Sequence, residues 1–427
     1  MLYTMENYFN NEMINLIDSE LSSINIDINI DLINRIKKDY ENNLSDFFIS
    51  RYKIRQRTGS DKILLLDDKK ITEYIENNFI IKKSDNSCNI ISYNNTNLID
   101  NAKFISEQGK AEIKKKLNFN LKLEWNIGSI YGIYNIFFKN IDDILNFLDK
   151  IKILIKITYF IFDKLSNNKN NNKVICYFYL TDLKKTINWE SKETIGINNV
   201  NTGMTSRSLI KLDQCNNDEY ILLWRKEELI KVYIHELIHY FDIDTNNYYD
   251  IKKLTNKICV VNSIQTIPNE AYTDFLTIII NSIIFSTYSN NNNIEVIIKN
   301  EIKFSLFQAA KILYYYGFTK WEDFNTTDCN NYFDQGSSVF SYYIIKSILL
   351  YYFNDTISIL KEMNNNETYY LNFKTNKINI KIFKDHIIKS FYKKDFSQEL
   401  NKILDSFNNI NIRSNIYKSL KMSIYSL

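Results

Sequence analysis

The sequence predicts an α+β protein that is mainly helical, with a small sheet preceding one central helix. Apolar residues recur at helical spacing in several long segments, and the clearest of these covers 142–165. Two short stretches, at 174–183 and 219–225, are rich in β-branched and aromatic residues and are typical of buried strands. The chain has 427 residues, of which 45% are hydrophobic, which is enough for a sizeable core and two or three structural units.

We expect three segments along the chain. Residues 1–166 are predicted to be mostly helical, 174–360 to contain the sheet and the central helix, and 361–427 to form a cap. An asparagine-rich stretch near 168–173 is typical of a loop and separates the first two segments. Within the cap, YYLNFKTNKINIKIF (369–383) is interpreted as a hairpin that short helices follow.

The middle segment contains the elements that surround the central helix. INNVNTGMTSRSLIKL (197–212) is predicted to form a loop and a strand, and the central helix follows at 226–241. Glu227 and Glu228 lie in the first turn of that helix, where acidic side chains complement the helix dipole. Further helices are predicted at 268–288, 295–316 and 336–353.

Composition and charge exclude several classes of protein. A formal net charge of +3 is close to balanced and predicts neither a nucleic-acid-binding protein nor a membrane-surface protein. The basic cluster RYKIRQR (51–57) is interpreted as the solvated face of a helix. No stretch has the length and apolar character of a membrane span, and the first residues do not resemble a signal peptide.

The five cysteines also indicate the cell compartment, because they are scattered along the chain without CxxC spacing. Such a pattern favours buried free thiols in a reducing compartment over a disulfide scaffold. Together these features predict an intracellular, cytoplasmic protein, and they leave the oligomeric state open.

The most informative motif is HELIH, His235 to His239, which contains two of the three histidines of the chain. Residues i and i+4 of a helix project from one face, so both imidazoles can reach the same metal ion. Zinc accepts imidazole ligands, and a catalytic zinc keeps one position open for water. Glu236 lies between the histidines and can act as the general base that activates this water. An ordinary buried helix with two hydrogen-bonded histidines is the competing interpretation.

A third metal ligand is expected in IPNEAYTD, 267–274. Pro268 is the only proline and stands where a helix can begin. Glu270 follows His239 by 31 residues and can complete a His–His–Glu set, and Asp274 lies one turn later on the same helix face. Asp274 can therefore accept a hydrogen bond from a liganding imidazole. Asp242 or Asp244 could supply a carboxylate ligand instead, but both lie so close to the end of the helix that Glu270 is favoured.

HExxH followed by NExxxD resembles the gluzincin, thermolysin-like zinc metallopeptidases. The resemblance implies a gluzincin-like core at 174–360 that hydrolyses peptide bonds with a bound Zn²⁺. Residues 199–350 also resemble uncharacterised metallopeptidase-like proteins of large cytoplasmic DNA viruses, so that host cytoplasm or virion is a predicted location. The resemblance implies the following roles: zinc ligands His235, His239 and Glu270, general base Glu236, histidine-orienting Asp274, and a supporting Asn269.

Gluzincins pair the substrate backbone with an edge strand before the active helix. The corresponding segment here is 201–210, with Asn201, Gly203 and Met204 as predicted substrate-binding residues, and a plain loop is an equally good interpretation. The family also uses a downstream tyrosine or histidine to stabilise the oxyanion. Tyr342 and Tyr343 are the predicted catalytic residues for that role, and His386 is an alternative.

The predicted function is therefore zinc-dependent hydrolysis of a polypeptide substrate, with no nucleic-acid partner. Two alternatives remain open. One is a zinc-binding structural or virion-associated protein that keeps the fold without turnover. The other is a metal-dependent hydrolase that acts on a bond other than a peptide bond.

Overall fold

The chain folds into two compact units. The sheet unit comprises Asn42–Lys184 and Asn201–Phe241, and the helical unit comprises Met1–Glu41, Lys185–Val200 and Asp242–Leu427. The predicted class, α+β and mainly helical, is confirmed. The computed structural model describes residues 11–19, 21–42, 46–57, 63–65, 68–81, 95–166, 172–206, 219–244, 268–289, 293–324, 333–364, 371–372, 376–407 and 414–426.

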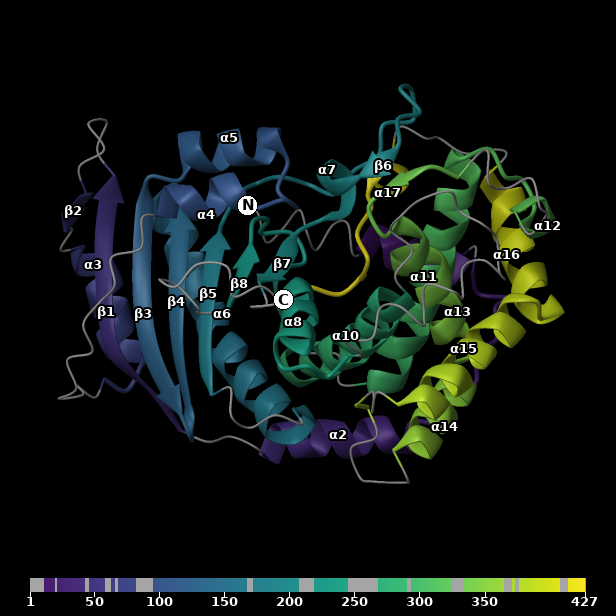
Figure 1. Cartoon of the computed structure of the whole chain (residues 1–427), viewed down its shortest axis with the longest axis horizontal. Helices are drawn as coiled ribbons and strands as arrows, with labels where there is room; N and C mark the ends of the chain where they lie inside the picture. The colour runs from purple at the N-terminus through teal and green to yellow at the C-terminus, as the bar shows by residue number, and fades with distance from the viewer. Residues whose placement is uncertain are drawn as a thin grey trace. The chain divides into compact units, whose positions relative to one another are not determined.

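The sheet unit is built on a seven-stranded sheet in the order β2-β1-β3-β4-β5-β8-β7 (Figure 1). The strands from β2 to β4 are antiparallel, β5 and β8 run parallel to β4, and β7 is antiparallel to β8. The strands predicted at 174–183 and 219–225 are confirmed as β5 and β8. The bounds are β1 Phe47–Arg57, β2 Ile63–Leu65, β3 Phe119–Ile127, β4 Ile130–Phe138, β5 Lys173–Tyr179, β7 Gly203–Ser206 and β8 Tyr220–Leu223.

The prediction that residues 1–166 are mostly helical was wrong for the segments that form β1, β3 and β4. In β3 and β4 buried side chains alternate with half-buried ones, the period-2 pattern of a sheet strand. Gly128, at φ 53°, makes the tight turn between them. The basic cluster at 51–57 lies in β1 and not on a helix, because its backbone pairs with β3. The predicted sheet was therefore too small.

The helix predicted at 142–165 is confirmed as α6, Ile141–Phe160, continued by a π-helical turn at Ile161–Leu165. The Asn140 side chain caps it by accepting a hydrogen bond from the Asp143 N–H at 2.9 Å. The segment connects β4 to β5, because parallel neighbouring strands need a long crossover connection.

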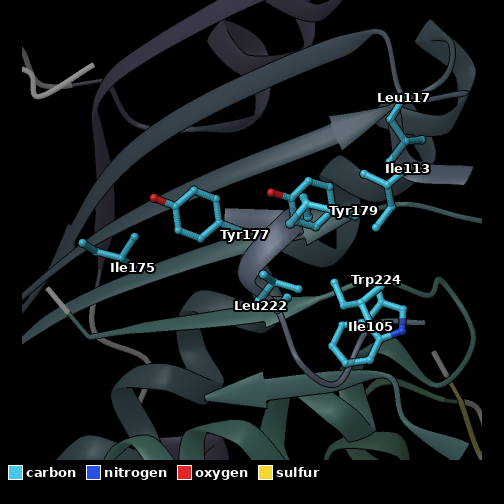
Figure 2. Packing of buried hydrophobic residues seen from close by; sticks show 10 residues of the cluster. Ile105, Ile113, Leu117, Ile175, Tyr177, Tyr179, Leu222 and Trp224 are labelled. Atoms are coloured by element: carbon cyan, nitrogen blue, oxygen red, sulfur yellow. The ribbon is translucent and has the colours of Figure 1, made fainter. Parts of the chain in front are cut away.

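Helices cover both faces of this sheet. On one face, α4 (Asn95–Asn101) and α5 (Glu107–Lys116) lie over β5 and β8, and Tyr177, Tyr179 and Leu222 pack against them (Figure 2). On the other face, Tyr134 and Phe178 point toward α6 and α8 (Leu229–Tyr240). Burial of these large apolar side chains, at about 25 cal/mol per Å², is what holds the helices to the sheet.

The helical unit surrounds the long helices α10 and α11, and the helices predicted at 268–288 and 295–316 are confirmed there. The segment 336–353 is not one helix but a π-helical turn, Phe340–Ile345, that runs into α13. A short parallel pair, β6 (Ile195–Gly196) and β9 (Gln335–Gly336), also belongs to this unit. The remaining bounds are α2 Asp31–Asn42, α7 Ile197–Val200, α10 Pro268–Tyr288, α11 Ile294–Tyr315, α12 Trp321–Phe324, α13 Lys346–Tyr351, α14 Phe353–Met363, α15 Lys377–Phe391, α16 Lys394–Ser406 and α17 Asn415–Lys418.

The predicted hairpin at 369–383 was wrong in its second half, because Lys377–Phe391 forms helix α15, whereas residues 369–370 and 373–375 lie outside the described residues. The Asn376 side chain caps this helix by accepting a hydrogen bond from the Asn379 N–H at 2.8 Å. Ile380, Phe383 and Ile387 are buried at helical spacing. The alternation of isoleucine with polar residues had favoured a strand, but the cap and the helical burial pattern decide otherwise.

The structure describes part of the two features from which the cell compartment was predicted, namely the apolar helices and the cysteines. None of the described helices combines the length and apolar character needed to cross a bilayer. Cys176 is a buried free thiol in β5, and burial raises its pKa far above the ordinary value. The other four cysteines lie outside the described residues.

Candidate functional site

The HExxH motif lies on α8, Leu229–Tyr240, in the sheet unit. The helix predicted at 226–241 therefore begins three residues later than expected. Glu228 precedes it with a left-handed backbone, φ 54° and ψ 29°, and its carbonyl accepts the hydrogen bond of the Val232 N–H at 2.9 Å. A positive φ is uncommon for glutamate, and such backbone strain is concentrated at functional sites.

The segment leading into α8 is attached to the end of β5. The Lys226 ammonium donates hydrogen bonds to Asp143 at 3.1 Å and to Asp182 at 2.6 Å. Burial lowers the pKa of Lys226, but the bonds to the two carboxylates outweigh burial, so that the pKa is raised overall. The Lys226 N–H also bonds the Thr181 carbonyl at 3.1 Å. These contacts hold the residues just before α8 against the end of β5 and the first turn of α6.

The back of α8 is held by a fully buried polar cluster. The hydroxyl of Tyr233 lies 2.9 Å from that of Tyr134 and 2.6 Å from that of Thr158, and the Cys176 thiol lies 3.9 Å from it. Burial raises the pKa of both tyrosines, so both stay neutral. Tyr233 precedes His235 by two residues, a rotation of about 200° around a helix, so the anchor and the motif occupy opposite sides.

The two motif histidines face each other across one helical turn. Their Nε2 atoms are 3.1 Å apart, and the ring centroids are separated by 4.7 Å. His235 is buried and His239 is half-buried. Two imidazole nitrogens that bind one tetrahedral zinc at 2.0–2.1 Å lie about 3.3 Å apart. The distance between the two nitrogens is therefore compatible with both binding one zinc ion, and each ring offers one nitrogen as a ligand.

Glu236 is buried and contacts the neighbouring strand β7. Thr205 Oγ1 lies 2.8 Å from Glu236 Oε2 and 3.0 Å from the Glu236 main-chain carbonyl oxygen. A Cβ added at Gly203 would approach Glu236 Oε1 to 2.7 Å and Val232 Cγ1 to 2.8 Å. Glycine is thus required where the strand backbone crosses α8 this closely. The carboxylate lies directly against the strand.

The predicted substrate strand is β7, the last strand of the described sheet in that direction. Gly203 and Thr205 point toward α8, whereas Met204 packs against the core on the other face, with Leu222 opposite it in β8. The Met204 side chain therefore packs partly against the core, on the face of β7 that points away from α8. Asn201 is half-buried and precedes the strand. Residues 207–210 of the predicted segment lie outside the described residues.

The other predicted metal-site residues belong to the helical unit. Asn269 is buried and Glu270 is half-buried, both in the first turn of α10. The side-chain amide of Asn269 lies 3.5 Å from Asp244 Oδ2, so Asp244 already has a contact with this turn. Asp274 is fully buried and lies 3.8 Å from the Lys346 ammonium. Asp242 is exposed.

The two predicted oxyanion residues, Tyr342 and Tyr343, differ in burial and in their contacts. Tyr343 is fully buried, and its hydroxyl donates to the Leu420 carbonyl at 2.7 Å, a contact that serves the core of the helical unit. Tyr342 is half-buried, on the same π-helical turn. Of the pair, only Tyr342 remains a suitable candidate, and its role stays a prediction.

His386 lies on α15 as a buried residue whose Nε2 is 2.9 Å from the Thr356 hydroxyl. Burial lowers its pKa to about 4, and the nearby Lys393 and Lys389 act in the same direction against Asp355. It is a structural histidine that stays neutral at physiological pH.

This shift predicts a pH dependence of folding. Because the pKa in the folded protein is about 4, below the usual value of 6.5, the unfolded chain binds the proton more tightly and stability is lost as the pH falls through this range. We expect the wild type to lose about 3 kcal/mol relative to the non-ionisable His386→Gln variant between pH 7 and pH 4. Urea unfolding of both proteins across this range measures the difference. Parallel curves would contradict the shift.

Thr205 was missed by the sequence analysis, which named Gly203 and Met204 on the same strand. The available signal was the alternation itself, since residues 203 and 205 of a strand share one face. Which face meets α8 depends on the pairing of β7 with β8.

No protein-family model matches the chain, and no solved structure matches it. The chain is 30% identical over 153 residues to an uncharacterized protein of Acanthamoeba polyphaga mimivirus. The alignment covers 33% of this chain and 34% of the relative, so the chain spans about a third of the relative's length. The predicted likeness to proteins of large DNA viruses thus has a counterpart in a mimivirus protein.

Proposed function

We propose that the protein is a zinc-dependent peptidase of the gluzincin type. The observation that carries the proposal is the pair of imidazole nitrogens of His235 and His239, which lie 3.1 Å apart on α8. Glu236, which stands between the two histidines in the sequence, is buried. A structural zinc site has no use for that carboxylate, whereas hydrolysis needs a base beside the metal.

The proposed ligands are His235, His239 and Glu270, which offer two ring nitrogens and one carboxylate oxygen. This donor set is typical of catalytic zinc, which leaves the fourth position for water or substrate. Glu270 is supported by the NExxxD pattern and by its half-buried place in the first turn of α10. Asp274 and Asn269 are proposed to support the ligands from behind by hydrogen bonding.

When bound, zinc would acidify a water molecule and polarise the substrate carbonyl. Glu236 would accept a proton from the attacking water and deliver it to the nitrogen of the leaving amine as the C–N bond breaks. The backbone of Asn201 and of β7 would align an extended polypeptide by adding it to the sheet. Tyr342 would donate a hydrogen bond to the developing oxyanion.

Metal content is the experiment that tests the site. The purified full-length chain is loaded with zinc, dialysed and measured by elemental analysis beside His239→Ala, Glu270→Ala and the control His386→Gln. We expect one zinc per chain in the wild type and in the control, and a zinc affinity at least about 10-fold weaker in the two ligand variants, because each loses one of three protein ligands.

The outcomes separate the parts of the proposal. Full zinc affinity in His239→Ala would disprove the histidine site. Full zinc affinity in Glu270→Ala, with zinc lost from His239→Ala, would remove that glutamate from the ligand set. Wild-type protein that holds zinc but cleaves nothing in a mixture of quenched fluorogenic peptides of random sequence would favour the structural or virion-associated alternative, or hydrolysis of another bond.

A further inference from the structure

We infer that Thr205 is a positioning residue that holds the carboxylate of Glu236 in place during turnover. The inference deepens the proposed function, on which it rests for the role of Glu236 as the base. It adds a side chain from β7 to a motif that otherwise lies entirely on α8, and it assigns that strand a task besides contact with substrate.

The geometry places one hydroxyl against two oxygens of the same residue. Thr205 Oγ1 is 2.8 Å from the carboxylate oxygen Oε2 of Glu236 and 3.0 Å from the main-chain carbonyl oxygen of Glu236. A hydroxyl carries one proton to donate and two lone pairs to accept. It can therefore donate to either oxygen by rotating about its C–O bond, with no movement of the heavy atoms.

This choice of acceptor matches the two forms that a general base adopts in one catalytic cycle. While Glu236 is ionised, the Thr205 hydroxyl donates to the carboxylate. After Glu236 has accepted the proton of the attacking water on the side that faces the reacting atoms, Oε2 can still accept the hydrogen bond of Thr205, and the hydroxyl can also turn to the main-chain carbonyl oxygen. The base thus keeps a partner before and after the transfer, and the carboxyl group need not turn away from the reacting atoms.

Gly203 restricts the carboxylate from a second direction. The strand backbone at this position lies so close that a Cβ would approach Glu236 Oε1 to 2.7 Å and Glu236 Cγ to 2.9 Å. Gly203 and Thr205 share the face of β7 that meets α8, because alternate residues of a strand point the same way. The Glu236 side chain is thus held between a close backbone contact and a hydrogen bond.

Such restriction is useful because glutamate has three rotatable side-chain bonds, and an unrestrained base spends little time in the reactive geometry. Hydrogen bonds to an ionised group are among the stronger ones in proteins. A displacement of the base by about 1 Å can cost about 100-fold in rate. Loss of the Thr205 hydroxyl should therefore lower kcat and leave substrate affinity nearly unchanged.

The test compares Thr205→Val, which removes the hydroxyl at constant shape, with Thr205→Ser, which keeps it. Thr72→Val, at a half-buried threonine of the helix Lys69–Asn78 in the same unit, is the matched control. With the zinc-loaded full-length protein and a fluorogenic peptide, we expect Thr205→Val to lower kcat about 10- to 100-fold with KM nearly unchanged. Thr205→Ser should restore kcat to within about 3-fold of the wild type, and the control Thr72→Val should match the wild type. Equal kcat in the valine and serine variants would overturn the inference.

Crystal structures of both variants provide a readout that does not need turnover. We expect the Glu236 carboxylate to keep its place in Thr205→Ser and to move or become disordered in Thr205→Val. If the wild type cleaves no peptide, the proposed function fails, and the structures alone then decide the positioning role. An unmoved carboxylate in Thr205→Val would refute that role even if the wild type is a peptidase.

Discussion

For the proposed peptidase activity, replacing Glu236 by glutamine is expected to lower kcat by about 10²- to 10⁴-fold, the usual contribution of a positioned general base. Zinc loaded onto the protein should remain bound in this variant, because Glu236 is not among the proposed ligands. Glutamine has nearly the shape of glutamate, and its side-chain oxygen can still accept the hydrogen bond of Thr205. The loss would therefore report proton transfer and not a disturbed fold.

The measurement is kcat on a fluorogenic peptide together with zinc content by elemental analysis. Glu107→Gln, an exposed glutamate on α5 of the same unit, is the matched control and should be as active as the wild type. Undiminished turnover in Glu236→Gln would show that the assigned base is wrong, even with zinc in place. Loss of zinc in the same variant would show that Glu236 is itself a ligand.

The largest expected effect on stability concerns Glu301 of α11 in the helical unit. This fully buried carboxyl group accepts hydrogen bonds from the Ser423 hydroxyl at 2.6 Å and from the Ile424 and Tyr425 N–H groups at 3.2 Å each. Glu301→Ala would leave the two buried N–H groups without their acceptor and would open a cavity, whereas the Ser423 hydroxyl can still donate to the Tyr425 carbonyl oxygen at 3.0 Å. Each N–H group costs about 1–3 kcal/mol and the cavity adds to this, so we expect the free energy of unfolding to fall by at least about 3 kcal/mol.

Urea unfolding at pH 6 measures this loss, and Glu295→Ala is the matched control. Glu295 lies on the same helix but is about half exposed, at 44%, in an ion pair with Lys299 at 2.7 Å. Exposed pairs contribute about 0–1 kcal/mol, so the control should unfold almost like the wild type. Equal effects of the two substitutions would contradict the role of Glu301 as an anchor of the segment 423–425.

The same carboxyl group gives a second check through pH. Burial raises its pKa from 4.5 to about 7, although Ser423, the two N–H groups and Lys346 oppose the change. The folded protein therefore binds this proton more tightly than the unfolded chain, and its stability should fall as the pH rises from about 4.5 to about 7. Glu301→Gln lacks this dependence, so its stability relative to the wild type should improve over that range.

Several elements were predictable because their signals are local. The spacing of HELIH places two histidines on one face of a helix whatever the rest of the chain does. Helices at 142–165, 268–288 and 295–316 carry long runs of apolar residues at helical spacing, and the structure contains all three. The strand at 174–183 was recognised from its β-branched and aromatic content.

The errors came from segments in which the local pattern was ambiguous. The basic residues of β1 could have belonged to a helix face, and only pairing with β3 makes the segment a strand. The helix at 377–391 has a short run of alternating isoleucines that resembles a strand, and its cap and its buried face decide the matter. In both cases contacts from distant parts of the chain outweigh local preference.

Two imidazoles one turn apart, a glutamate between them, and a second acidic pattern 31 residues later are visible in the sequence. These features depend on residue type and helical spacing alone. The neighbours of Glu236 and the role of Tyr343 in the core depend instead on how distant segments pack. Thr205 lies 31 residues before Glu236 in the chain, and the two meet because β7 pairs with β8 in one register and α8 packs on that face. Strand register and helix packing depend on the whole unit, so no local pattern specifies such a contact.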